Sequence, residues 1–337
     1  MNLFHYIFRR CLFFIPVIIG VTLITFIISH VVPGDPALMM AGLRAKPEVV
    51  ENLREKLGLN KPVLVQYLIY LKQLVQGDFG NSLHSHRPVI KDLKEYFPAT
   101  LELTLFSALI ALVIAIPFGV ISATMKDRWP DHISRLIALS GVAMPSFWLG
   151  LMLLMVFYVL LGILPGGGRI STNMTAPNHI TGLYTLDALF MGNLPLFWDT
   201  LKHLILPGVT QSAYIIGVLT RIGRSTMLEV LRQDYIMTAH AKGLAGSIVI
   251  YKHALKNAFI PVVTMLGMCF GALLGGSILI ESIFSWPGMG RYAVKAITFL
   301  DFPAVMGVTV VIAFLFVIIN LLVDFLYYFL DPRIRYD

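Results

Sequence analysis

Few side chains in this sequence have the types and spacing that chemistry needs. His84 and His86 flank Ser85 and resemble half of a metal site, but no third carboxylate or cysteine ligand stands beside them, so solvated loop histidines are the favoured interpretation. Residues 166–168 are three glycines after Pro165, a composition that suits a phosphate-binding loop. Because no Gly-Lys-Ser or Gly-Lys-Thr follows them, we interpret them as a turn. We expect no catalytic, metal or cofactor site.

Other chemical motifs are also missing from the sequence. It contains no Walker A pattern, so any nucleotide hydrolysis linked to this chain must come from another subunit. It contains neither His-Glu-x-x-His nor Gly-x-Ser-x-Gly. Cys11 and Cys269 lie in apolar runs, where buried thiols are expected and a disulfide is not. These observations argue against an enzyme and against a disulfide-stabilised secreted fold.

The elements that carry these residues follow from a very apolar composition. Of the 337 residues, 57% are apolar and 13% are charged, and the mean hydropathy is +0.78. Soluble domains are about 45–50% apolar and about 25% charged. A water-soluble chain of this composition would lack polar surface to cover its core, so most apolar side chains must face lipid or other helices. We therefore predict an all-α integral membrane protein.

Six stretches without Lys, Arg, Asp or Glu are long enough to be transmembrane helices, which need about 20 apolar residues. They are residues 11–32, 103–125, 136–163, 204–220, 259–280 and 302–323. The first follows Arg9-Arg10, as a secretory signal would, but it exceeds the length of a signal core and no small-x-small cleavage pattern follows. We interpret it as a retained first helix.

The distribution of Lys and Arg predicts the orientation. The net charge of +7 by itself could suggest nucleic-acid binding. With six spans and the N-terminus inside, however, the cytoplasmic segments hold thirteen basic residues and the two short outer loops hold four. This is the asymmetry of the positive-inside rule. We predict that both termini are cytoplasmic and that the basic excess reports topology, with no nucleic-acid partner.

Three regions follow from this topology. Residues 1–32 form an N-terminal tail and the first helix, residues 33–102 form an outer, periplasmic loop region with short amphipathic helices, and residues 103–337 form a transmembrane core. A second outer loop is expected over residues 164–203. Pro117 and Pro145 each remove a backbone donor inside a span and predict kinks.

Some polar residues lie in or beside the predicted spans. Intramembrane carboxylates usually indicate function, but Glu102 and Glu281 lie at span ends, where they can reach water. Ser107 and Gln211 are among the polar residues that a substrate path could use.

The most informative segment is residues 221–258, which are predicted to be cytoplasmic. Its apolar residues form a helical stripe: Met227, Leu228, Val230, Leu231, Tyr235, Ile236 and Ala239. Gly243 then interrupts the helix, and residues 247–257 predict a second short helix with Lys252 and Lys256 on one side. Two interfacial helices on the membrane surface and a knob that docks a partner fit this pattern equally well.

This segment resembles the permease subunits of binding-protein-dependent ABC importers. Of the general motif Glu-Ala-Ala, three residues, Gly, nine residues, Ile-x-Leu-Pro, only Ala239, Gly243 and Leu255 match here. The dipeptide/oligopeptide/nickel branch has its own version, which these residues resemble: Asp234-Tyr235-Ile236, Thr238-Ala239, Ala241-Lys242-Gly243-Leu244, His253-Ala254-Leu255 and Asn257-Ala258.

The resemblance covers nearly the whole chain. Its further motifs, in order, are Pro33-Gly34-Asp35-Pro36, Gly77-Asp78-Phe79-Gly80, Pro98-Ala99-Thr100-Leu101-Glu102, Ile283-Phe284-Ser285-Trp286-Pro287-Gly288-Met289-Gly290-Arg291 and Asp331-Pro332-Arg333-Ile334-Arg335. The chain length and the long first outer loop are most similar to the first permease subunit of a dipeptide importer.

The resemblance implies a type I ABC importer permease fold in a bacterial inner membrane. It also implies a second homologous permease, an outer substrate-binding protein and two cytoplasmic ATPases that carry ATP and Mg. The implied substrates are dipeptides first, then oligopeptides or nickel chelates. Segment 221–258 would be the coupling segment that contacts an ATPase, through Glu229, Asp234, Ala239, Lys242, Gly243, His253, Leu255 and Asn257.

Two further groups are candidate sites. Glu281, Trp286, Pro287, Gly288 and Arg291 form either an outer gate or docking loop or an ordinary loop. Gly267, Gly271 and Gly275 are spaced by four and predict a helix face without side chains, which packs either inside the subunit or against the partner permease.

A secondary transporter or channel would also have six apolar spans. Ion coupling usually leaves charged or paired polar groups at mid-span, and the charge-free spans here argue against it.

Overall fold

The structure, a computed structural model, describes residues 3–31, 37–38, 45–56 and 58–330. The described part is helical, with an isolated β-bridge between Asn81 and Pro88, so the all-α prediction is confirmed there. The chain divides into two compact units. Unit 1 contains Met1–Phe97 and Gly288–Val317, and unit 2 contains Pro98–Pro287 and Ile318–Asp337.

The long helices are the apolar segments of the sequence. They are α1 (Leu3–Val31), α5 (Val89–Thr124), α9 (Leu194–Val230), α12 (Leu255–Ile283) and α14 (Phe302–Leu330). The shorter helices are α3 (Pro47–Lys56), α4 (Val63–Val75), α6 (Trp129–Ala143), α7 (Ser146–Leu153), α8 (Tyr184–Phe190), α10 (Asp234–Ala241), α11 (Gly246–Ile248) and α13 (Met289–Thr298). Two π-helical segments extend the bundle, η1 (Leu154–Leu160) after α7 and η2 (Val249–Ala254) before α12.

By length and composition, four described helical segments could cross a membrane, and a bent pair could supply a fifth crossing. The four are Val89–Thr124, Leu194–Val230, Gly246–Gly275 and Phe302–Val323. The predicted first span falls in α1, whose described apolar part, Phe14–Ser29, is shorter than a full crossing. A multi-pass membrane fold is therefore present, and the count of six stays a prediction.

The third predicted span is not one kinked helix. Helix α6 ends at Ala143, α7 begins at Ser146, and the two helical segments meet at an angle of 107°. Met144 adopts an extended conformation, with ψ of 127°, because the ring of Pro145 disfavours the α conformation in the residue before it. Pro145 also lacks an N–H, so the helix stops and restarts.

Two helices begin inside segments that were predicted to be outer loops. Helix α9 begins at Leu194, inside the predicted outer loop, because the Asn193 side chain caps it by accepting a hydrogen bond from the Leu196 N–H at 3.1 Å. Helix α5 begins at Val89 and continues through Pro117 to Thr124. A helix can begin in polar sequence before its apolar part. Hydropathy alone therefore places the starts of α5 and α9 too late in the chain.

The core of unit 2 is built from α5, α9 and α12. Small residues on α5, such as Ala108, Ala111 and Ala115, let it pack closely against Ile215 and Leu219 of α9. Cys269 of α12 is buried in the same cluster as a free thiol, as predicted, whereas the Cys11 side chain lies outside the described side chains.

Glycines set the crossing of α6 and α9. A methyl group at Gly217 would collide with the carbonyl oxygen of Ala138, and one at Gly141 would collide with that of Ala213. Gly267 similarly packs against Val323 of α14 within the chain, whereas a methyl group at Gly275 would meet no atom within 4 Å. Close approach at glycine is typical of membrane helix pairs.

Polar residues inside unit 2 bond to one another and to backbone groups. The Gln211 amide donates to the Leu273 carbonyl at 2.8 Å, and its oxygen accepts from the Ser107 hydroxyl at 3.2 Å. These contacts join α9 to α12 and α5. Both side chains therefore hold helices of unit 2 together.

In unit 1, Tyr67 joins α4 to α1, with its hydroxyl 3.1 Å from the Thr22 hydroxyl and 3.2 Å from the Ile19 carbonyl oxygen. The start of α5 packs against α13 and α14 through Val89, Leu93 and Met289. His84 stacks on Phe299 with ring centroids 4.1 Å apart.

Candidate functional site

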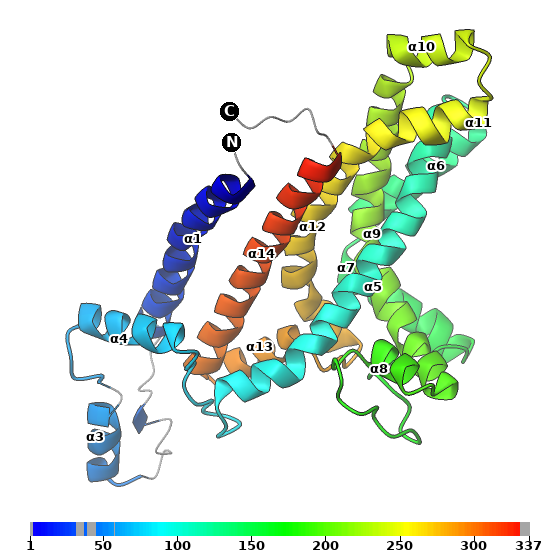
Figure 1. Cartoon of the computed structure of the whole chain (residues 1–337). Helices are drawn as coiled ribbons and strands as arrows, with labels where there is room; N and C mark the ends of the chain where they lie inside the picture. The colour runs from blue at the N-terminus through cyan, green and yellow to red at the C-terminus, as the bar shows by residue number, and fades with distance from the viewer. Residues whose placement is uncertain (1–2, 32–36, 39–44, 57, 331–337) are drawn as a thin grey trace. The chain divides into compact units, whose positions relative to one another are not determined.

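A short helix, α10, lies at one end of the long helices of unit 2, next to α11, and α8 lies at the opposite end (Figure 1). Asp234 occupies its first turn, where a negative charge is stabilised by the helix dipole. Gly243 follows the last turn with φ of +76°, and its N–H donates to the His240 carbonyl at 2.9 Å. A left-handed glycine after the last turn is a common helix end. The local sequence thus fixes both ends of α10.

Apolar contacts fix α10 to the bundle. Ile236 and Ala239 are buried in a cluster with Met227 of α9 and Val249 of η2. Val120 of α5 belongs to the same cluster. An eight-residue helix has little stability alone, so these contacts hold it in place.

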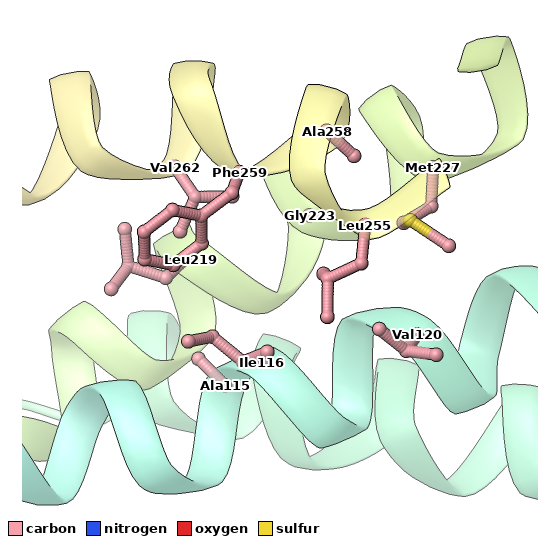
Figure 2. Close-up of a pocket in the computed structure, with 10 residues that line it drawn as sticks. All are labelled: Ala115, Ile116, Val120, Leu219, Gly223, Met227, Leu255, Ala258, Phe259 and Val262. Carbon is pink, nitrogen blue, oxygen red and sulfur yellow. The ribbon is translucent and has the colours of Figure 1, made fainter. Parts of the chain in front are cut away.

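The packing beneath this cluster is tight. Figure 2 shows residues of α5, α9 and α12 around a cavity of about 10 Å³, with Leu255 and Met227 pointing into it. This is about the smallest space that holds one water molecule, and its lining is apolar. The three helices therefore pack against one another with little empty space at the end that carries α10.

A polar contact adds to this attachment. The Asn257 amide of α12 donates to the Tyr235 hydroxyl of α10 at 2.8 Å and to the His253 carbonyl at 3.1 Å. Both side chains are exposed, so this hydrogen bond fixes orientation more than stability.

The predicted second short helix, residues 247–257, is not separate. Helix α11, η2 and α12 form one uninterrupted helical run from Gly246 to Ile283. The residues after Gly246 include neither glycine nor proline until Pro261, so nothing stops the helix before it enters the membrane region.

The predicted coupling residues divide into surface and packing positions. Glu229, Asp234, Lys242, Gly243 and Asn257 are exposed, His253 and Leu255 are half-buried, and Ala239 is buried. A methyl group at Gly243 would meet no atom within 4 Å, so its positive φ, and not a lack of space, favours glycine there.

A buried carboxylate beneath this segment was missed by the sequence reasoning. Asp131 of α6 accepts hydrogen bonds from Nε and a terminal nitrogen of Arg224 of α9, both at 2.8 Å. The Asp127 N–H and the Ser122 hydroxyl of α5 also donate to it. The four groups come from three helices and a connection. Asp131 and Arg224 are 93 residues apart, and no local pattern pairs them.

The predicted outer-gate residues lie in different units. Trp286, 1% exposed, donates from its indole nitrogen to the Ala99 carbonyl at 2.8 Å, and Pro287 is half-buried beside it in the chain. Gly288 and Arg291 belong to unit 1, where Gly288 caps α13.

The expectation that the carboxylates at span ends reach water is wrong for Glu281. Glu281 is fully buried and accepts a hydrogen bond from the Thr100 hydroxyl at 2.7 Å. The fold of unit 2 brings the start of its α5 segment against the end of α12, which excludes water from this carboxylate.

Glu102 is also buried, in an ion pair with Arg169. The Thr185 N–H and hydroxyl both donate to Glu102 at 2.8 Å. Arg169 additionally donates to the Gly182 carbonyl and lies 3.5 Å from the centre of the Tyr184 ring. The ion pair fastens the loop before α8 to α5, and sequence reasoning missed it because its partners are 67 residues apart.

The three glycines after Pro165 make a turn with a packing role. The Gly168 N–H donates to the Phe284 carbonyl at 2.9 Å, and a methyl group at Gly167 would lie 2.5 Å from the same oxygen. The loop therefore approaches the end of α12 too closely for a larger residue.

Comparison with known proteins places this helical bundle in a family of membrane permeases. Residues 115–336 match the family described as binding-protein-dependent transport system inner membrane component, and residues 3–104 match its N-terminal region. The chain belongs to this family, whose members are transporter components and not catalytic enzymes.

Curated relatives match along nearly their whole length. A probable D,D-dipeptide transport system permease protein of Escherichia coli is 49% identical over 97% of this chain and 96% of its own. A dipeptide transport system permease protein of Alkalihalophilus pseudofirmus is 48% identical over 98% and 99%. A glutathione transport system permease protein of E. coli is 39% identical over 98% and 99%.

A solved structure shares the fold. The inward-facing MetNI methionine ABC transporter aligns with a TM-score of 0.52 over 69% of this chain and 93% of that one, at 15% identity. At this identity the likeness shows the fold alone.

Proposed function

We propose that this chain is a permease subunit of an ATP-driven importer of dipeptides in a bacterial inner membrane. In this proposal it forms the substrate path together with a second homologous permease. An outer substrate-binding protein delivers the peptide, and two cytoplasmic ATPases, which carry ATP and Mg, supply the energy. The names of the relatives that are 49% and 48% identical support dipeptides as the substrate.

The observation that carries the coupling role is the attachment of α10. Its buried face joins three long helices, while Asp234, Met237 and Lys242 remain exposed to a partner. A helix that moves as one body can bias two arrangements of a bundle, whereas a slack loop cannot. We infer that segment 221–258 docks an ATPase through this exposed surface.

The buried cluster at the opposite end of unit 2 supports a role for its loops at the outer mouth of the path. Trp286 and Glu281 hold the end of α12 against α5, and the pair of Glu102 and Arg169 holds the loop before α8. We propose that these contacts keep the outer mouth in one shape.

Glutathione is a second candidate substrate, because a glutathione transport permease is 39% identical over 98% of the chain. Oligopeptides and nickel chelates remain alternatives within the same architecture.

Uptake of a labelled dipeptide should depend on this chain, and an excess of unlabelled dipeptide should compete better than glutathione, a longer peptide or a nickel chelate. Equal uptake in a strain lacking the chain would contradict the substrate proposal.

Replacement of Gly243 by Trp tests the coupling role. The new side chain has a strained φ and projects where α10 would meet a partner, so we expect normal membrane insertion with dipeptide uptake lowered at least about tenfold. The matched control is Gly162→Trp, because Gly162 also has a positive φ, +63°, and no atom within 4 Å of an added methyl group. Uptake that is equal in both variants would refute the role of α10.

A further inference from the structure

A basic groove lies along α6 and α9, apart from the contacts that attach α10. It encloses about 590 Å³. Its polar lining residues are Ser122 of α5, His132 and Arg135 of α6, and Thr220, Arg221, Arg224 and Ser225 of α9. Every lining residue belongs to unit 2.

Of the three arginines that line the groove, only Arg224 has an ion-pair partner among the described residues. Arg224 is neutralised by Asp131, to which it donates two hydrogen bonds. Arg135 and Arg221 are exposed, and neither forms an ion pair with another described residue. The acidic group nearby, Asp127, lies 3.7 Å from the Lys126 ammonium and is largely exposed. The groove therefore offers two uncompensated guanidinium groups to an anion.

The groove also contains an unused hydrogen-bonding group. The Thr220 hydroxyl is buried, and among the described residues it has no hydrogen-bond partner. A buried hydroxyl without a partner is uncommon and costs about 1–3 kcal/mol. A ligand oxygen in the groove would satisfy it.

One side of the groove is apolar and continues along α6. Leu136 and Leu139 line it and are 65% and 67% exposed, and Val142 lines it one turn further on. This row begins beside the arginines and leads away from the end of α6 that carries Trp129. A ligand with a charged end and a long apolar part would match both surfaces.

The groove lies near the membrane surface. Trp129 opens α6, is 73% exposed and follows Arg128, a combination typical of the headgroup level of a bilayer. Arg135 is six residues further along, about 9 Å at the helical rise. An arginine at this depth reaches the phosphate region by extending its side chain.

We propose that this groove binds one anionic phospholipid, with its phosphate between Arg135 and Arg221 and its acyl chains along Leu136, Leu139 and Val142. Arginine suits this role because its planar group binds phosphate oxygens in pairs. Basic pockets between transmembrane helices are known to take anionic headgroups. The inference requires that α6 and α9 lie in the bilayer, and it does not depend on the substrate or on which side is cytoplasmic.

The test measures lipid retained by the intact complex. The chain is purified with its partner subunits and stripped of lipid. It is then mixed with equal amounts of phosphatidylglycerol and phosphatidylcholine that have identical acyl chains. Native mass spectrometry should show one tightly retained phosphatidylglycerol per copy of this chain. Equal retention of both lipids would overturn the proposal.

Variants locate the site. Arg135→Gln with Arg221→Gln should lower phosphatidylglycerol retention at least about tenfold, whereas Arg135→Lys with Arg221→Lys should restore part of it, because lysine keeps the charge but not the paired geometry. Arg128→Gln is the matched control, because it removes an exposed cation beside the groove without touching its lining. An equal loss in that control would show a diffuse surface charge and refute a defined site.

Two competitors distinguish other occupants. Millimolar inorganic phosphate should not displace the lipid, because it gains nothing from the apolar row, and a dipeptide should not displace it either. Displacement by phosphate would show a site for free anions, and displacement by the dipeptide would place the groove in the substrate path. Either result would overturn the lipid proposal, and neither would weaken the proposed import function.

Discussion

At the scale of single residues, the main features that the sequence did not predict are two buried ion pairs. Asp131 is fully buried, whereas its partner Arg224 keeps 23% of its side chain exposed. Arg169 and Glu102 are both buried. Breaking a buried pair is costly because the remaining charge is left uncompensated, even though the intact pair adds little net stability.

We expect Asp131→Asn to destabilise unit 2 by about 3 kcal/mol, near the low end for a broken buried pair because Arg224 retains some water. Asp127→Asn is the control, since this carboxylate is 70% exposed and its contact with Lys126 is worth less than about 1 kcal/mol. Thermal unfolding in detergent, followed by circular dichroism, gives both values. Similar losses of stability in the two variants would show that the ion pair of Asp131 and Arg224 contributes no more than an exposed one.

Asp187 provides a test with pH. Burial alone would raise the pKa of its carboxyl, but hydrogen bonds from the Thr181 hydroxyl and from the backbone N–H groups of Thr181 and Gly182 outweigh it, so the pKa lies below its usual value. A lowered pKa means that the carboxylate stabilises the fold above about pH 4, its ordinary pKa, and that this contribution is lost as pH falls through the lower folded value.

Asp187→Asn should therefore lower the melting temperature at pH 7, where the carboxylate contributes in full. The difference between the variant and the unmodified protein should shrink as the pH is lowered from 5 to 3. Melting curves across this range check the sign. A difference that grows toward acid would mean that the carboxyl is stabilised in its neutral form.

At the scale of elements, glycine decides where helices touch. Gly217 allows α9 to pass directly over the backbone of α6 at Ala138, and Gly267 allows α12 to approach α14 at Val323. Gly275, on the same face as Gly267, meets no atom of this chain within 4 Å. Of the two predicted roles for the glycine face, packing within the subunit accounts for Gly267 but not for Gly275.

Substitution of Gly217 and of Gly275 by alanine distinguishes a glycine that packs within the chain from one that does not. Gly217→Ala should destabilise the chain by about 1–3 kcal/mol, because its methyl group collides with backbone that cannot move alone. Gly275→Ala should leave the stability of the isolated chain unchanged or slightly raised, since alanine favours a helix over glycine by about 1 kcal/mol.

The same Gly275→Ala variant reports on a partner. If that face meets the second permease, the methyl group should lower the yield of co-purified permease while the melting temperature of the chain alone is unchanged. Undiminished co-purification would remove Gly275 from the interface.

What the sequence could predict depended on how local each signal was. The end of α10 at Gly243 and the burial of Met227, Ile236 and Ala239 follow from neighbouring residues and are confirmed. The single helical stripe predicted there is wrong, because α9 ends at Val230, α10 begins at Asp234, and Tyr235 is exposed. At Pro145 the sequence analysis predicts a kink and not a break, because the apolar run continues on both sides of the proline. The rule that the residue before proline avoids the α conformation would have predicted a stop.

Contacts between distant segments left no sequence signal. Glu281 and Glu102 look like ordinary span-end carboxylates, and only the fold shows that Thr100 and Arg169 cover them. The sequence likewise gives no sign that Asp131 pairs with Arg224, because charged residues are expected at the cytoplasmic ends of helices whether or not they pair. Pairing of this kind requires knowledge of which helices are neighbours.

At the scale of the whole molecule, the orientation and the number of crossings depend on each other. If α1 crosses the membrane, the N-terminus lies on the same side as α10, as the distribution of Lys and Arg predicts. If α1 does not cross, the N-terminus lies opposite. The described apolar stretch of α1, Phe14–Ser29, is short enough that length alone does not decide between these topologies.

Cysteine labelling in intact cells decides both points, starting from a variant with Cys11 and Cys269 replaced by Ser. Ser247→Cys, in the segment that contains α10, and Thr172→Cys, in the loop before α8, both introduce exposed thiols. An impermeant maleimide should label the second in intact cells and the first only after permeabilisation. The reverse pattern would invert the predicted topology.

The first span is tested by adding a cysteine-containing tag before Met1 of the same variant. With six crossings, this tag should behave like Ser247→Cys and remain unlabelled until the cells are opened, because four spans, an even number, then lie between the tag and Ser247. Labelling of the tag in intact cells, together with protection of Ser247→Cys, would show that α1 does not span the bilayer. In that case five crossings remain, and the positive charges of Arg9 and Arg10 would lie outside, against the positive-inside rule.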